Sequence, residues 1–333
     1  MRAALIIAAK DLKVELRSKE MLSALGLDAN ILPRVYESPE ITGEISRETA
    51  LVTGLKAGTP VVGGGGDQAA SAVGNGIVSP GLTSATLGTS GVIFAYTDAP
   101  KLDPKGRIHT FCHAVPGKWH VMGVTQGAGL SLRWFRDNFG ESEAWLARQT
   151  GVDPYDLLIQ EAEQVPPGSA GVVWLPYLMG ERTPHCDPNA RAALIGLAAS
   201  HGRGHIVRAI MEGVAFSLRD TLSIFSELGV PVESIRLGGG GSRSALWRQI
   251  QADVYGHAVD TAGADEGAAY GAAILAAVGI GLWPTVDAAC DALVRGAAKT
   301  IPRPEVVSLM NDRYNAYTCI YPALRRFMPD VHA

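Results

Sequence analysis

The hydrophobic and polar positions of this chain follow two periods, one typical of helices and one typical of strands. The strongest helical pattern covers residues 206–225, where apolar side chains recur at every fourth position: Ile206, Ile210, Val214, Leu218 and Leu222. Gly229 and Pro231 predict that this helix ends before them. A further helix is expected over residues 127–139, followed by an exposed, charged helical stretch up to about residue 165. Helices are also expected over residues 244–254, over 266–278 with Asp265 as N-cap, and over 305–327.

Strand patterns alternate with these helices. Residues 83–95 place apolar and hydroxyl side chains on either side of a glycine turn at 88–90, which predicts two strands joined by that turn. Residues 107–115 and 118–125 repeat the hairpin pattern around Pro116 and Gly117. Short strands are also expected at 61–62, 172–177, 235–237 and 259–262. Strands that alternate with helices predict an α/β protein with a largely parallel sheet.

Composition narrows the class of protein. Hydrophobic residues make up 47% and charged residues 19% of the 333 positions, which excludes collagen, coiled coil and wholesale disorder. Lys and Arg number 29 against 33 Asp and Glu, a net charge of −4. This balance supplies no basic field for nucleic-acid phosphates, so no nucleic-acid partner is expected. Glycine is unusually frequent, with 39 residues, many of them in runs.

The cysteines and the N-terminus indicate the compartment. The four cysteines lie far apart and form no C-x-x-C pair, which argues against a zinc site or a disulfide framework. No cleavage region of a signal peptide follows the short apolar run at residues 3–9, and no window reaches the roughly 18 apolar residues of a membrane span. We therefore expect a cytoplasmic protein that binds no membrane.

Four glycines at 63–66 separate a strand from Asp67 and Gln68. Glycines there let the backbone approach a ligand and leave the N–H groups of the next helix directed at it. A carboxylate at this place would repel phosphate, but it suits a general base that takes the proton of a substrate hydroxyl. The alternative is that Asp67 is only the N-cap of the helix.

Two further glycine turns are candidates for phosphate contacts. Gly88, Thr89 and Ser90 bring hydroxyl and N–H donors into one small volume, which can hold phosphate oxygens without a lysine. An ordinary hairpin turn is the alternative there. Residues 238–241 offer backbone to a nucleotide, with close packing of helix against sheet as the alternative.

Two common nucleotide-binding motifs are not met. The turn at 238–241 is not a Walker A loop, because Arg243 and Ser244 stand where its lysine is required. Residues 64–69 fit G-x-G-x-x-A, but hydroxyl residues occupy 83–86, where a dinucleotide site needs an acidic residue. Glycine turns with hydroxyls at one and a carboxylate at another favour a phosphotransferase over a hydrolase or a redox enzyme.

Two other polar groups have weaker interpretations. The loop at 181–185 reads as exposed and charged, and it either reaches a substrate or partner subunit or is simply solvated. His113 and His120 lie on facing strands of a predicted hairpin, where packing is favoured over metal binding. No His, Cys and carboxylate set has the spacing of metal ligands, so no metal site is predicted in the chain.

The sequence resembles the FGGY family of carbohydrate kinases over about residues 15–328. The C-terminal signature of that family is matched by Ala192, Leu194, Gly196 and Leu197 and, after a gap of seven, by His205, Ile206, Ala209, Ile210, Met211 and Glu212. Within the family, residues 111–117, 174–184 and 246–253 are most similar to the xylulokinase branch.

The resemblance implies an α/β actin-like ATPase (ribonuclease H-like) fold. It implies a remnant of the N-terminal FGGY domain over residues 1–62 and the C-terminal, nucleotide-binding FGGY domain over residues 63–333. The implied reaction transfers the γ-phosphoryl group of ATP, with Mg²⁺, to D-xylulose. Asp67 resembles the catalytic base and Gln68 a neighbour of the sugar. The residues that resemble ATP contacts are Gly88, Thr89, Ser90, Gly129, Arg133, Gly239, Gly240, Gly241 and Ser244.

The chain also departs from the family pattern. Family members open with an Asp-x-Gly-Thr turn for phosphates and Mg²⁺, followed by a domain that supplies most sugar contacts. Residues 1–62 resemble only the end of that domain, and residues 1–12 resemble nothing that we can place. Three interpretations follow: a xylulokinase, a truncated nucleotide-binding pseudokinase without activity, or an FGGY kinase for glycerol, gluconate or ribulose. The surface facing the first domain ought to be apolar and uncovered, so a homodimer is also expected.

Overall fold

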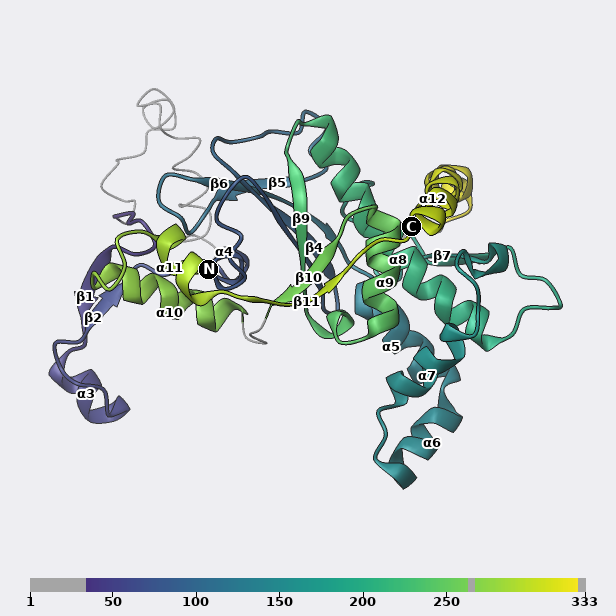
Figure 1. Ribbon diagram of the computed structural model, residues 1–333, viewed down its shortest axis with the longest axis horizontal. Helices are drawn as coiled ribbons and strands as arrows, with labels where there is room; N and C mark the ends of the chain where they lie inside the picture. The colour runs from purple at the N-terminus through teal and green to yellow at the C-terminus, as the bar shows by residue number, and fades with distance from the viewer. Residues whose placement is uncertain (1–33, 263–266, 329–333) are drawn as a thin grey trace.

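The computed structural model describes residues 34–262 and 267–328, and a seven-stranded sheet runs through its centre (Figure 1). The strands are, in chain order, β3 (Gly81–Leu87), β4 (Gly91–Thr97), β5 (His109–Cys112), β6 (Trp119–Thr125), β9 (Val232–Gly238), β10 (Val259–Ala262) and β11 (Gly296–Thr300). They lie in the order β11-β10-β9-β3-β4-β6-β5. The two predicted hairpins therefore form one side of the sheet.

The sheet is mixed, so the expectation of a largely parallel sheet was wrong. Strand β9 runs parallel to both of its neighbours, β3 and β10. The other four neighbouring pairs of the sheet are antiparallel. The reason is that both predicted hairpins join the same sheet as the strands of the strand–glycine–helix units. A tight turn can connect only antiparallel strands.

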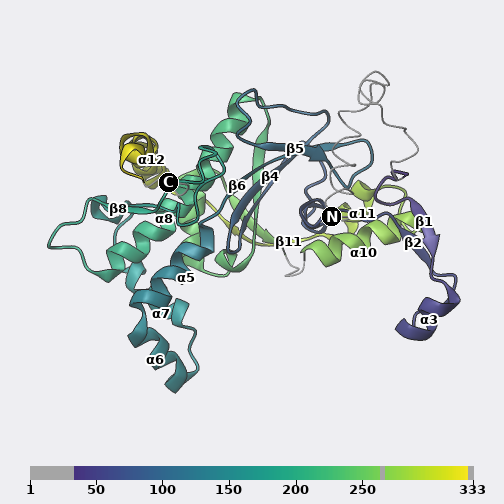
Figure 2. The same ribbon diagram turned by 180° about the vertical axis from the view of Figure 1, so that it is seen from behind.

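Helices cover both faces of the sheet (Figures 1 and 2). One core contains residues of α5 (Ala128–Phe139), α8 (Arg203–Glu227), α9 (Ala245–Tyr255) and α12 (Pro304–Leu324), and the other contains residues of α4 (Asp67–Gly74), α10 (Gly267–Gly279) and α11 (Val286–Leu293). Strand β4 lies between the two cores. Its Ile93 and Ala95 belong to the first, whereas Val92, Phe94 and Tyr96 belong to the second, because successive side chains point to opposite faces.

Helix α8 confirms the strongest helical prediction. Its Ile210, Val214 and Leu218 are fully buried against the sheet. The helix ends at Glu227, and Gly229 follows with a left-handed φ of 64°, a conformation that favours glycine. The sequence pattern therefore set both the buried face and the end of this helix.

Helices α4 and α10 pack closely through glycine. A Cβ at Gly271 would collide with the carbonyl oxygen of Ala70, and a Cβ at Gly74 would collide with the backbone of Gly267. The run of small residues in α10 thus has a packing reason. The N-cap predicted at Asp265 lies outside the described residues.

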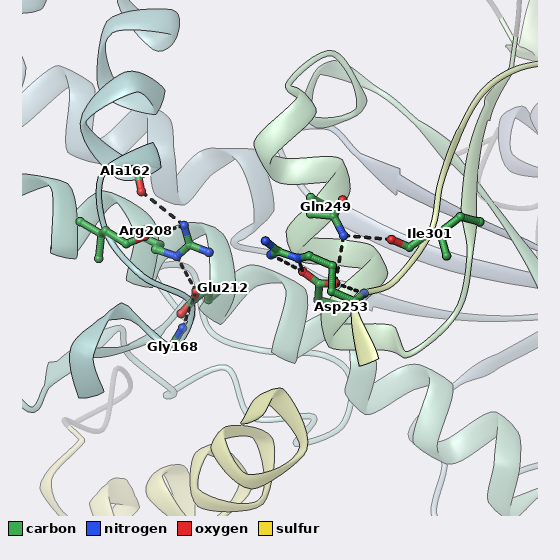
Figure 3. A network of polar contacts seen from close by, with 9 residues as sticks. Ala162, Gly168, Arg208, Glu212, Gln249, Asp253 and Ile301 are labelled. Atoms are coloured by element: carbon green, nitrogen blue, oxygen red, sulfur yellow. Dashed lines mark hydrogen bonds and ion pairs between the residues drawn. The ribbon is translucent and has the colours of Figure 1, made fainter. Parts of the chain in front are cut away.

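Helix α12 is fixed to α9 by a carboxylate–guanidinium pair (Figure 3). The buried Asp253 carboxylate accepts from the Arg303 backbone N–H at 2.8 Å and from its Nη2 at 2.6 Å. Gln249 Nε2 donates to the same carboxylate at 2.9 Å and to the Ile301 carbonyl at 3.1 Å. These bonds hold the chain just before α12 begins.

The remaining elements lie around this body. Strands β1 (Ile41–Glu44) and β2 (Pro60–Val62) pair, and with α3 (Arg47–Thr53) they form an arm that projects at one end (Figure 1). The others are α6 (Glu141–Thr150), α7 (Pro154–Glu163), the pair β7 (Val173–Leu175) and β8 (Ala193–Ile195), and the short turns η2 (Ser169–Gly171), η3 (Gly240–Ser242) and η4 (Arg325–Phe327). Across residues 34–262 and 267–328, no helix has the length and apolar character needed to cross a membrane.

Candidate active site

A cavity of about 530 Å³ opens where the two glycine turns meet α5, α7 and α9. Its lining residues are Leu87, Gly88, Thr89, Gly129, Leu132, Arg133, Asp153, Tyr155, Asp156, Ile159, Gly240, Gly241, Arg243, Ser244 and Trp247. Most of the residues expected at ATP are therefore brought together, although they come from three separate segments of the chain. Ser90 and Gly239 belong to the same two turns but do not line the cavity.

The first turn, between β3 and β4, presents unused donors. The Gly88 N–H donates to the Ser90 carbonyl at 3.0 Å and closes the turn. The N–H groups of Thr89 and Ser90 have no hydrogen-bond partner in the described part of the chain, and both residues are exposed. Adjacent free N–H groups and two hydroxyls form a concavity suited to an anion.

The N-terminus of α5 forms hydrogen bonds with this turn. The Gly129 N–H donates to the Gly88 carbonyl at 2.9 Å, and the Leu130 N–H donates to the Thr89 carbonyl at 3.1 Å. A Cβ at Gly129 would lie 2.5 Å from the Gly88 oxygen. Gly129 thus permits the close approach of helix and turn, and its own N–H is used within the protein.

The second turn lies beside the first because β3 and β9 are parallel neighbours whose carboxyl ends share one edge of the sheet. Gly239 has a φ of 75°, and a Cβ there would collide with the Leu87 carbonyl. A Cβ at Gly241 would lie 2.7 Å from Leu87 Cβ. The close packing weighed as an alternative is therefore present, while Gly240 stays exposed at the cavity.

Ser244 begins the helix that follows the second turn. As predicted, it precedes α9, and its hydroxyl oxygen accepts from the Trp247 N–H at 3.2 Å as the N-cap. The hydroxyl hydrogen can still donate to a ligand in the cavity.

Asp67 and Gln68 do not line the cavity but lie at the N-terminus of α4, a helix whose buried residues pack on the other face of the sheet. Asp67 is exposed, and its Oδ1 accepts from the Gln68 N–H at 2.8 Å. Asp67 is the first helical residue and Gly66 is the N-cap, so the alternative in which Asp67 serves as N-cap was wrong.

The glycines before Asp67 are held by the segment at residues 38–40. The Gly63 N–H donates to the Glu40 carbonyl and the Gly64 N–H to the Ser38 carbonyl, each at 2.9 Å. Gly64 has a φ of 67°, which favours glycine at this position. Hydrogen bonds to the segment at residues 38–40 therefore hold the loop that precedes Asp67, while the Asp67 carboxylate itself is exposed to solvent.

Helix α7 forms a wall of the cavity, whereas its sequence predicted an exposed stretch. It contributes Tyr155, Asp156 and Ile159, and Asp153 just before it is the N-cap that accepts from the Tyr155 N–H at 2.9 Å. Burial raises the pKa of Tyr155. The i, i+4 spacing of Tyr155 and Ile159 after an Asp-Pro cap was the available sequence signal.

The loop at 181–185 is only partly exposed: Arg182 is exposed as expected, whereas two of its polar residues are buried. Glu181 and Thr183 are 3% and 1% exposed. The Thr183 hydroxyl accepts from the Val124 N–H at 3.1 Å and donates to the Arg107 carbonyl at 2.7 Å. The prediction of exposure was wrong for Glu181 and Thr183, because residues at the end of β6 form hydrogen bonds with their side chains.

His113 and His120 pack as expected for facing strands. Their ring centroids lie 5.8 Å apart, and Phe94 stacks on His120 at 4.2 Å. His113 Nε2 lies 3.0 Å from the Ile77 carbonyl, and burial lowers the pKa of His113 to about 4. Within the described residues, no group of three or more His, Cys, Asp and Glu is arranged to hold a metal ion.

Comparison with known proteins places this architecture. Residues 83–280 match the C-terminal domain and residues 11–74 the N-terminal domain of the FGGY family of carbohydrate kinases. A xylulose kinase of Bacillus subtilis is 37% identical over 304 residues, 91% of this chain and 59% of the relative. A gluconokinase of the same species is 37% identical over 275 residues, 82% of this chain and 53% of the relative. The solved structure of a xylulose kinase from Rhodospirillum rubrum superimposes with a TM-score of 0.80 at 31% identity, covering 93% of this chain and 61% of that chain.

The two-sided mixed sheet with glycine turns at one edge is the actin-like ATPase (ribonuclease H-like) fold of the sugar kinases, as the resemblance implied. This chain belongs to the FGGY family of carbohydrate kinases. It spans 59% of the length of the Bacillus subtilis xylulose kinase that it matches.

Proposed function

We propose that this chain binds ATP in the cavity between its two glycine turns and transfers the γ-phosphoryl group to D-xylulose, giving ADP and D-xylulose 5-phosphate. The observation that carries the proposal is the junction of the turns at 88–90 and 239–241. There Thr89, whose N–H has no hydrogen-bond partner among the described residues, borders a cavity of nucleotide size. The similarity to proteins named xylulose kinases supports this choice of sugar.

In the proposed reaction, Asp67 accepts the proton of a sugar hydroxyl while its oxygen attacks the γ-phosphorus. A new P–O bond forms, and the bond between the γ-phosphorus and the β–γ bridging oxygen breaks. ADP leaves with the electron pair of that bond. Exposure of Asp67 at the start of α4 leaves its carboxylate open to a hydroxyl, and we assign Gln68 beside it to the sugar.

The phosphates are assigned to the turn at 88–90. Its free N–H groups and the hydroxyls of Thr89 and Ser90 would offset the negative charge of the phosphates. Arg133 on α5 is exposed at the cavity and has no ion pair among the residues that the structure describes, so its guanidinium is available to the nucleotide. The adenosine part is assigned to the turn at 239–241 and Ser244.

Mg²⁺ enters the proposal only with ATP. The described residues offer no group of three or more carboxylate, His or Cys ligands, and Mg²⁺ in kinases binds through phosphates, waters and one or two carboxylates. We therefore derive no step through a metal held by this part of the chain. Mg²⁺ is proposed as the counter-ion that accompanies the ATP phosphates.

We further propose a division into an N-terminal remnant, residues 1–62, and a nucleotide-binding domain, residues 63–333. The packing of α4 on α10 through Gly74 and Gly271 supports counting α4 with the second part. We also propose a homodimer through the arm, because α3 has no buried residue and its Leu51 and Val52 are 88% and 87% exposed.

The test is an ADP-release assay with ATP, Mg²⁺ and D-xylulose. Wild-type turnover is expected, with a loss of about 10²–10⁴-fold in Asp67→Asn. Asp312→Asn, an exposed carboxylate on α12, is the matched control and should keep full activity. ATP binding without turnover in the wild type would contradict the kinase proposal and favour a catalytically inactive nucleotide-binding protein.

A gluconate kinase is the second candidate, since a gluconokinase is as identical to this chain as the xylulose kinase is, over a shorter match. A panel of D-xylulose, gluconate, glycerol and ribulose decides between them. We expect the highest kcat/KM with D-xylulose. A higher value with gluconate would overturn the choice of sugar while keeping the reaction.

A further inference from the structure

A buried carboxyl lies at the end of β6, next to the strand that begins after the first glycine turn. Glu181 is 3% exposed, and its Oε2 accepts from the Thr125 hydroxyl at 2.7 Å. Its Oε1 accepts from the Arg182 N–H at 2.7 Å. The Ser217 hydroxyl of α8 donates to Thr125 Oγ1 at 2.9 Å. The group thus joins a loop, a strand end and the central helix.

The first link from this cluster to the turn runs through the sheet. Thr125 is the last residue of β6 and pairs with Gly91, the first residue of β4, which directly follows Ser90. A Cβ at Gly91 would lie 2.9 Å from Thr125 Cγ2. The Thr125 side chain therefore packs directly beneath the residue at which the turn re-enters the sheet.

The second link runs through α5. Only residues 126 and 127 separate Thr125 from this helix, whose Gly129 and Leu130 N–H groups hold the carbonyls of Gly88 and Thr89. A shift at the end of β6 would move the start of α5 and both of these hydrogen bonds. The position of Thr125 thus affects the turn in two ways, through its contact with Gly91 and through the start of α5.

We infer that Glu181 is a positioning residue for the phosphate turn, acting through Thr125 to fix the Gly88–Ser90 backbone beneath the proposed nucleotide. The inference rests on the proposed function in assigning the phosphates to this turn. Glu181 itself touches neither the cavity nor Asp67.

The hydrogen-bonding pattern requires a polar group at position 181. The Arg182 N–H and the Thr125 hydroxyl both donate to the carboxyl, and an apolar side chain would leave them without this partner in a buried site. Glu181 forms no ion pair within the described residues, and burial raises its pKa to about 8. Its contacts are therefore hydrogen bonds that fix geometry, and no cation of the site depends on its charge.

The experiment compares Thr125→Val, which removes the hydroxyl and keeps the shape, with Thr125→Ser, which keeps the hydroxyl. Glu181→Ala and Glu181→Gln form the second pair, because the glutamine carbonyl oxygen can still accept from the Arg182 N–H while its amide group donates to Thr125 Oγ1 and so keeps the two side chains joined. Ser223→Ala is the control: Ser223 of α8 loses a hydroxyl contact with Tyr314 of α12, away from β6. All are full chains, and melting temperatures confirm that each is folded.

Two readouts are measured. Amide hydrogen exchange without nucleotide reports the Gly129 and Leu130 N–H groups, and titration reports the affinity for ATP and for AMP, which lacks the β- and γ-phosphates. Thr125→Val and Glu181→Ala are expected to speed exchange at these two amides and to weaken ATP binding roughly tenfold, with AMP binding unchanged. Thr125→Ser, Glu181→Gln and Ser223→Ala should behave like the wild type.

The outcomes separate the two proposals. Unchanged exchange rates at the Gly129 and Leu130 amides in both Thr125→Val and Glu181→Ala overturn the positioning role, whether or not the affinity for ATP changes. Equal losses of ATP and AMP affinity also overturn it, since they report a general loss of structure. Faster exchange in a protein whose wild type binds no ATP supports the positioning of the turn and overturns the proposed function.

Discussion

Arg208 and Glu212 form an ion pair one turn apart on α8, with 2.8 Å between Nε and Oε1 and side chains that are each 3% exposed (Figure 3). Arg208 Nη1 also donates to the Val165 carbonyl at 2.8 Å, and Glu212 accepts from the Gly168 N–H at 3.0 Å. The pair therefore ties the chain just after α7 to the core. Because α7 lines the cavity, the family signature that contains Glu212 supports the proposed nucleotide site from a distance.

Arg208→Met should lower the free energy of unfolding by about 3–5 kcal/mol, because it leaves the Glu212 carboxylate buried without its cation. Urea denaturation of the full chain measures this change. Lys118→Met is the control, since its pair with Asp98 is largely exposed and screened by solvent and should contribute little to the free energy of unfolding. Equal losses in the two variants would show that burial of the Arg208 pair has no special effect.

Gly129→Ala should weaken ATP binding by tenfold or more, on the order of 1.4 kcal/mol or above. The added Cβ would lie 2.5 Å from the Gly88 oxygen, so α5 and the turn must move apart. Calorimetric titration with ATP measures the affinity. Gly202→Ala is the matched control, because a Cβ there meets nothing within 4 Å. Wild-type affinity in Gly129→Ala would mean that the turn does not contact the nucleotide.

Local sequence patterns predicted the parts of the fold that depend on local physics. The four-residue period of α8 gave its buried face, and the glycine turn at 88–90 gave the β3–β4 hairpin. The direction of strand pairing could not be predicted in the same way, because it depends on contacts such as Thr86 with Gly238, far apart in sequence. Strand β11 was missed because most of it is exposed and shows no alternation.

The sequence predicted those parts of the site where glycines allow a close approach of the backbone. It did not predict the parts that reach the cavity only through tertiary packing. The spacing of Tyr155 and Ile159 indicates a helix with an apolar face, but no local signal shows that this face meets α9 at a cavity. Glu181 was taken as exposed for a related reason. Its partners Thr125 and Ser217 are supplied by β6 and α8, and sequence spacing does not show that they converge.

The arm provides a test of the proposed homodimer. Light scattering should give a mass of twice 35.0 kDa for the wild type. Val52→Glu should shift the protein toward the monomer, because a charge on the exposed apolar face of α3 opposes its burial. Leu102→Glu, at a leucine that is 74% exposed outside the arm, should leave the mass unchanged. A monomeric wild type would contradict the homodimer.

The stability of the protein should depend on pH through Asp220 of α8. This carboxyl accepts from the Tyr314 hydroxyl at 2.7 Å, and burial raises its pKa from 3.8 to about 7. Between about pH 4 and pH 7 the folded chain keeps this proton while the unfolded chain releases it. The unfolded state then binds fewer protons, so the contribution of Asp220 to stability falls as pH rises through this window and is constant above it.

Asp220→Asn removes this dependence and keeps the size of the side chain. The difference in unfolding free energy, variant minus wild type, should therefore rise from pH 4 to pH 7 and level off above. Urea titrations at pH 5, 6, 7 and 8 measure it. Taking the difference cancels groups that Asp220 does not influence, such as His113, whose pKa burial lowers to about 4 and which acts in the opposite direction. A difference that is independent of pH would show that Asp220 titrates in the folded chain as it does in the unfolded one.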